Sequence, residues 1–130
     1  MLIKNININK LNIEGARRYY NYLLELYQSK NIRYDWSGTL IIKDENTEIL
    51  EYEASQVISY FKSTDIKSLI DNVSTDKLLE LRVFVVYYLV APLIFSELID
   101  VKYFEYKHLL INKTGIANLI ELVKSNLNIK

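Results

Sequence analysis

The chain of 130 residues contains no cysteine. It therefore has no disulfide framework, no thiolate nucleophile and no cysteine-based zinc site. Such a chain is compatible with a reducing compartment. Its first residues also lack the basic, apolar and small-residue sections of a signal peptide. We therefore expect a cytoplasmic protein.

Histidine and glycine are scarce as well. His108 is the single histidine, and the three glycines, Gly15, Gly38 and Gly115, lie far apart. One histidine cannot supply the paired-histidine motifs of zinc hydrolases or the signatures of deaminases. Isolated glycines cannot build a phosphate-binding loop or a dinucleotide fingerprint. We therefore expect a protein that is not an enzyme and that holds no metal or cofactor.

One short motif keeps a catalytic alternative open. Glu105-Tyr106-Lys107 has the acid-x-lysine spacing that metal-dependent nucleases place on a strand. There the carboxylate binds Mg²⁺ and the lysine steadies the attacking water. The motif also requires a second acid on a neighbouring strand, and three matching residues often occur by chance. A metal-dependent nuclease is the least favoured hypothesis.

Neither sign of charge is in excess, since 16 basic and 16 acidic residues give a net charge of zero. A dedicated nucleic-acid binder usually shows a basic excess. Isoleucine, lysine, asparagine and tyrosine supply 52 residues (17, 12, 12 and 11 respectively). This bias is typical of an AT-rich genome, as in some bacteria, mobile elements and viruses.

The longest apolar run lies between Arg82 and Glu97, where 14 residues carry no charge. As a helix this run covers roughly 21 Å, which is short of the roughly 30 Å hydrocarbon core of a bilayer. It predicts a helix over about residues 76–99 that is buried on every side, and no membrane partner. Pro92 predicts a kink or break, so helices over 76–90 and 92–99 are the alternative.

Shorter patterns predict the remaining elements. We expect a strand over residues 2–8, a helix over 12–29 capped by Asn12, helices over 55–62 and 65–72 (the second capped by Thr64), a strand over 102–111, and a final helix that opens at Thr114.

Residues 39–53 allow two predictions. Strands over 39–43 and 48–52 would flank a turn over 44–47 and form a hairpin. A helix from Asn46 is the alternative, because Leu50, Ala54 and Val57 also share a helical face. With the hairpin favoured, the predicted fold class is α+β and mainly helical. Amphipathic helices surround the buried helix in a single domain over residues 1–130, beside a small sheet.

The first helix carries more apolar surface than one packing partner needs. A second stripe beside its main apolar face consists of Leu11, Tyr19, Tyr22 and Leu26. Tyrosine combines a large apolar ring with a polar tip, which suits protein interfaces. The favoured function is therefore a protein-protein interaction module, either a homodimer or a binder of one protein partner. Packing of this stripe within the chain is the alternative.

Two charged groups suggest other partners. Lys10, Arg17 and Arg18 could hold phosphates, which makes a small nucleic-acid-binding regulator the second hypothesis. Glu14 and Glu25 on the same polar face weaken it. The acidic segment with Asp44, Glu45 and Glu48 could meet a basic partner surface, or could be a solvated turn.

Overall fold

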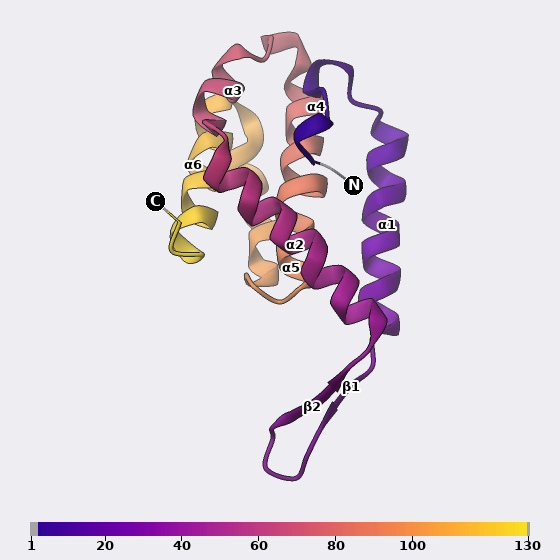
Figure 1. The fold of residues 1–130 in the computed structure, drawn as a ribbon. Coiled ribbons are helices and arrows are strands. Elements are labelled where there is room, and N and C mark those ends of the chain that lie inside the picture. Colours follow the sequence, from indigo (N-terminus) through magenta and orange to yellow (C-terminus); the bar gives the residue numbers. More distant parts are fainter. Residues whose placement is uncertain (1–2, 130) are drawn as a thin grey trace.

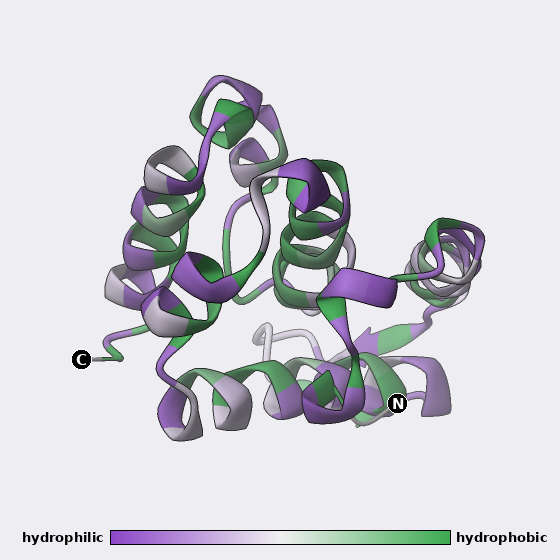
Figure 2. Cartoon of the chain, turned by 90° about the horizontal axis from the view of Figure 1, so that it is seen from above, coloured by the Kyte–Doolittle hydropathy of each residue, from purple (hydrophilic) through white to green (hydrophobic). Residues whose placement is uncertain are grey.

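A helix with few charges runs through the middle of the protein. The computed structural model describes residues 3–129. In it, the segment Thr75–Phe95 is helical throughout. Figure 2 shows that this segment is coloured hydrophobic over most of its length and is surrounded by other helices. Leu81, Phe84, Leu89 and Leu93 are each at most 1% exposed. The prediction of a buried central helix is confirmed, although the helix ends at Phe95 rather than at residue 99.

The elements of the described chain confirm the mainly helical α+β class. Eight of them are helices or strands labelled in Figure 1: α1 Ile13–Ser29, β1 Ile32–Tyr34, β2 Leu40–Lys43, α2 Glu45–Ser63, α3 Ile66–Asn72, α4 Leu78–Val83, α5 Ala91–Phe95 and α6 Lys113–Asn126. Short 3₁₀ turns cover Ile3–Asn5, Ile8–Lys10 and Thr75–Lys77, a longer 3₁₀ segment covers Val101–Ile111, and a π-helical segment covers Phe84–Val90.

The π-helical segment is the way in which the central helix accommodates Pro92. Proline has no backbone N–H and its ring crowds the preceding turn. The turn before it widens, so that the Ala91 N–H reaches the carbonyl of Val86, five residues back. The helix therefore continues through the predicted break and ends at Phe95, because Glu97 adopts a left-handed backbone conformation (φ 65°).

Thr75–Phe95 is the one helix in the described part of the chain that is long and apolar enough to cross a membrane, and 61% of its most apolar window is buried inside the protein. The core helix of a soluble protein gives the same signal, so this length and composition are weak evidence for a membrane span.

The other helices cover this central segment. α1 runs alongside it and α2 crosses in front of both, while α3 and α6 lie on the opposite side (Figure 1). A second, smaller core cluster forms where α1, α2 and α5 meet, and contains Leu23, Leu50, Ala91 and Phe95. The hairpin of β1 and β2 leaves the helical body at this corner.

Two predicted strands are wrong. The N-terminal segment forms 3₁₀ turns instead (residue 2 lies outside the described residues), and Val101–Ile111 is also 3₁₀. In both cases a side chain holds the local backbone in a turn. The side-chain oxygen Oδ1 of Asn7 accepts a hydrogen bond from the Asn9 amide at 3.1 Å, and the Asp100 carboxylate accepts one from the Lys102 amide at 2.8 Å. Such local bonds compete with strand pairing.

The predicted hairpin over residues 39–53 is also wrong in its second half. β2 is present, but it pairs with β1, and residues 45–63 form the single helix α2. The alternative of a helix is correct, because Leu50, Ala54 and Val57 are each at most 1% exposed. Asp44 starts this helix by accepting hydrogen bonds from the amide and hydroxyl of Thr47, at 2.9 and 2.8 Å.

Two further helix starts differ by a residue or two from the predictions. Asp65, rather than Thr64, caps α3 by accepting a hydrogen bond from the Ser68 amide at 3.1 Å. Asn112 caps α6 and accepts one from the Gly115 amide at 2.7 Å, so that Thr114 lies inside the first turn. The cap of α1 at Asn12 is as predicted.

The two helical glycines provide a matched test of the packing. A Cβ atom at Gly115 would overlap the carbonyl oxygen of Leu109 and lie 2.8 Å from its carbon, whereas one at Gly15 meets nothing closer than 3.5 Å. We expect Gly115→Ala to lower the free energy of unfolding by about 2 kcal/mol or more, because backbone must move. Gly15→Ala should raise it by roughly 0.5–1 kcal/mol, because alanine loses less entropy in a helix. Urea unfolding measures both, and equal effects would contradict the packing of Val101–Ile111 on α6.

Candidate functional site

The β-hairpin is the one described element that projects from the helical body (Figure 1). Its strands are antiparallel, with Ile32 opposite Lys43, Arg33 opposite Ile42 and Tyr34 opposite Leu40. Ile41 has no partner on β1 in this register, so the β-bulge lies on β2. Every residue of β2 is exposed.

Five large apolar side chains of this hairpin face solvent. The exposed fractions are 60% for Tyr34, 99% for Trp36, 40% for Leu40, 59% for Ile41 and 48% for Ile42. We call these five residues the apolar hairpin. Tyr34 and Leu40 lie opposite each other, so their side chains share one face of the hairpin. Exposed apolar side chains grouped on a folded protein mark an interaction site, whereas single exposed apolar residues need no explanation. Trp36 is also the only tryptophan of the chain.

The tip that carries Trp36 is ordered by Asp35. One carboxylate oxygen of Asp35 accepts hydrogen bonds from the hydroxyl of Ser37 (2.6 Å), the amide of Ser37 (2.9 Å) and the amide of Thr39 (2.8 Å). Gly38 completes the turn with φ +86°, a conformation that glycine adopts without strain. The hydrogen bonds from Ser37 and Thr39 hold the pKa of Asp35 below its ordinary value.

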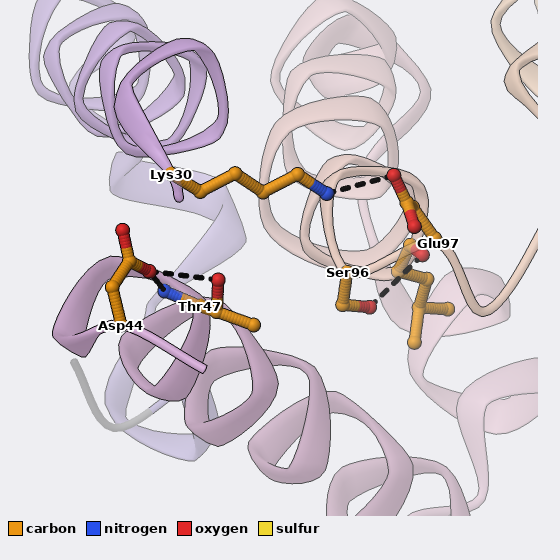
Figure 3. Close-up of polar contacts among 6 residues, drawn as sticks. Lys30, Asp44, Thr47, Ser96 and Glu97 are labelled. Carbon is orange, nitrogen blue, oxygen red and sulfur yellow. Dashed lines mark hydrogen bonds and ion pairs between the residues drawn. The ribbon is translucent and has the colours of Figure 1, made fainter. Parts of the chain in front are cut away.

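The base of the hairpin is held by Asp44 and Lys30. One oxygen of Asp44 accepts the Thr47 bonds, and the other accepts a hydrogen bond from the Asn31 amide, so both ends of the hairpin meet at one side chain. Lys30 binds Glu97 at 2.7 Å and so ties the end of α1 to the end of the central helix (Figure 3). The hydrogen bond from the Thr47 amide is the main cause that lowers the pKa of Asp44.

The predicted stripe on α1 is mostly covered by the chain itself. The ring of Tyr19 stacks on Tyr88 with 5.1 Å between centroids. Burial is the main cause that raises the pKa of Tyr19, with Glu53 adding to it. Leu11 and Leu26 pack against the two core clusters, and Tyr22 is 44% exposed. Of the four predicted interface residues, Tyr22 is the one that offers much surface to a partner.

The predicted basic residues share one end of α1. Lys10 lies in the 3₁₀ turn before the helix, and Arg17 and Arg18 lie in its first half; all three are exposed. Arg17 makes an ion pair with Glu14 at 3.2 Å. Their contact with nucleic acid stays a prediction.

The predicted acidic turn is the start of a helix. Asp44 is its cap, and Glu45 and Glu48 are exposed in the first turn of α2, where negative charge favours the helix dipole. These two glutamates lie beside the base of the hairpin and remain candidates for contact with a partner.

Glu105, Lys107 and His108 are exposed on the 3₁₀ segment Val101–Ile111, so the strand that the nuclease motif requires is not formed there. Among residues 3–129, no three histidine, aspartate or glutamate side chains are grouped so as to hold a metal ion.

Sequence reasoning missed the strand β1 and the exposure of Trp36. The signal was present as the alternation of Ile32, Tyr34 and Trp36 directly before Ser37-Gly38, since alternating apolar residues followed by a turn predict a hairpin strand. The charged residues between them, Arg33 and Asp35, gave this segment the composition of a loop.

The ordered tip predicts a pH dependence that Trp36 reports. Because the pKa of Asp35 is lowered in the folded hairpin, its hydrogen bonds stabilise the turn at and above the ordinary pKa of about 3.9. They are lost as the pH falls through the lower value. We expect the fluorescence anisotropy of Trp36 to drop below that pH while far-UV circular dichroism still shows folded helices. Asp35→Asn cannot gain a proton and should show no such drop; an identical drop would contradict this account.

In comparisons with known proteins, no protein-family model, no curated protein and no solved structure matched the chain.

Proposed function

We propose that the chain is a protein-protein interaction module, without catalytic activity, that contacts its partner through the apolar hairpin. The observation that carries the proposal is the side chain of Trp36, 99% exposed at a tip that six hydrogen bonds among Asp35, Ser37, Gly38 and Thr39 hold in place. Tryptophan and tyrosine supply the largest binding free energies in protein interfaces. An ordered tip loses less conformational entropy on binding than a flexible loop does.

A protein partner suits this tip better than a membrane does. The carboxylate of Asp35 sits directly beside Trp36 and, with its lowered pKa, stays charged at neutral pH. Inserting Trp36 into the hydrocarbon of a membrane would also move the charged carboxylate of Asp35 out of water, which is energetically unfavourable. A protein surface can accept the ring and leave Asp35 at a hydrated rim.

Nucleic acid is the second candidate, because Lys10, Arg17 and Arg18 are exposed together at one end of α1. The hairpin itself carries few cations for phosphate contact. Lys43 pairs with Glu51, which leaves Arg33 as the cation without an ion pair within residues 32–43. Phosphate contacts supply most of the affinity of nucleic-acid binding. The small number of cations on the hairpin therefore favours a protein partner over nucleic acid.

Photo-crosslinking at position 36 tests the proposal. A photoreactive residue replaces Trp36 in the full chain, expressed in the cells that carry its gene, and adducts are identified by mass spectrometry. We expect a discrete protein adduct, because Trp36 would be buried in the partner. Tyr34→Asp in the same chain should lower the affinity at least about tenfold, since it places a charge in the contact.

Leu122 provides the matched control, because it is 46% exposed on α6 and far from the hairpin. A photoreactive residue there should give no such adduct. The proposal fails if position 36 yields no protein adduct, or yields only adducts with lipid or nucleic acid.

A further inference from the structure

The sequence of β1 and its turn is self-complementary in an antiparallel arrangement. Residues 32–36 read isoleucine, arginine, tyrosine, aspartate and tryptophan. When two copies of this segment run antiparallel with the two Tyr34 residues opposite each other, Arg33 of each copy lies opposite Asp35 of the other. Ile32 then lies beside the turn that carries Trp36, because β1 ends at Tyr34. Opposite charges and apolar pairs placed directly across two strands stabilise a sheet.

The backbone of β1 is arranged for the same pairing. The amide of Asp35 donates to the carbonyl of Thr39 at 2.9 Å, so the polar backbone groups of Asp35 face β2. Because these groups alternate along an antiparallel strand, the N–H and C=O of Tyr34 face the other, open edge. Two Tyr34 residues across a two-fold axis can therefore exchange both hydrogen bonds.

This edge of β1 is open and regular. In the described chain the sheet has two strands, so nothing pairs with the outer edge of β1. The bulge at Ile41 lies on β2 and disrupts that edge instead. An isolated two-stranded hairpin is at best marginally stable in water, and two further strands would stabilise it.

We propose that the partner of the apolar hairpin is a second copy of this chain, joined through β1 to give a four-stranded sheet in the order β2-β1-β1-β2. This inference rests on the proposed function and adds the identity of the partner. Two-fold symmetric dimers of this kind are the commonest protein oligomers.

The edge of β1 offers apolar surface to a second copy. Tyr34 on β1 is 60% exposed, and Trp36 in the turn that follows it is 99% exposed. The net charge of zero means that two copies do not repel each other as wholes.

The mass in solution and the fluorescence of Trp36 test the dimer. We expect sedimentation equilibrium to give twice the chain mass. The emission maximum of Trp36 should move to shorter wavelength as the protein concentration rises, because the ring leaves water. A chain that remains monomeric at millimolar concentration, with emission independent of concentration, overturns the proposal.

Three variants separate this interface from any other. Arg33→Glu places like charges opposite each other twice in the dimer and should raise its Kd about 10- to 30-fold. Adding Asp35→Asn removes that repulsion while keeping an oxygen for the turn, and should recover part of the affinity. Tyr34→Pro removes an N–H that β2 does not use, so it should abolish the dimer and leave the helical circular dichroism unchanged.

Arg17→Glu is the matched control, since it makes the same change of charge on the exposed face of α1. It should leave the Kd unchanged. A dimer that persists in Arg33→Glu and in Tyr34→Pro overturns the proposed interface. A monomer whose position 36 crosslinks to a different protein overturns the dimer alone, whereas a monomer without any protein adduct overturns the proposed function too.

Discussion

Burial of one apolar helix governs the arrangement of this protein. The second half of this helix, Phe84–Phe95, carries no charge, and ten of these twelve residues are buried by the surrounding helices. The apolar faces of α1, α2 and α6 are used for this purpose, with Leu23, Leu50 and Ile116 each at most 1% exposed.

The hairpin projects because Asp44 serves two elements. Its carboxylate ends the hairpin by binding the Asn31 amide and starts α2 by binding Thr47. Both strands therefore leave the body at one point, beside the Lys30–Glu97 ion pair. In the sequence Asp44 looks like part of a charged surface patch, but in the structure its carboxylate mainly accepts hydrogen bonds from backbone amides. Glu45 and Glu48, which follow it, are exposed.

The sequence was sufficient to predict secondary structure where an apolar pattern repeats over several helical turns. It was insufficient where a single hydrogen bond determines whether a segment forms a strand, a turn or a helix. The long apolar run, the helix after Asn12 and the final amphipathic helix all carry repeated apolar residues, and all three were predicted. The choice between strand and helix after residue 43 depended on the Asp44–Thr47 contact, and the turns at Asn7 and Asp100 on similar local bonds. Of the four residues predicted to form an interface, Tyr22 keeps much exposed surface, whereas the exposure of Trp36 was hidden in a segment of mixed charge.

The π-helical segment Phe84–Val90 has a consequence for how this chain tolerates change. A helix turns about 100° per residue. Loss of one residue from this segment would restore an ordinary turn and swing α5 around its axis, taking the Phe95 ring away from Tyr20 and Tyr27, which lie 5.5 and 5.4 Å from it. The number of residues here is therefore constrained as well as their identity, because an insertion or deletion would change the direction in which α5 presents Phe95.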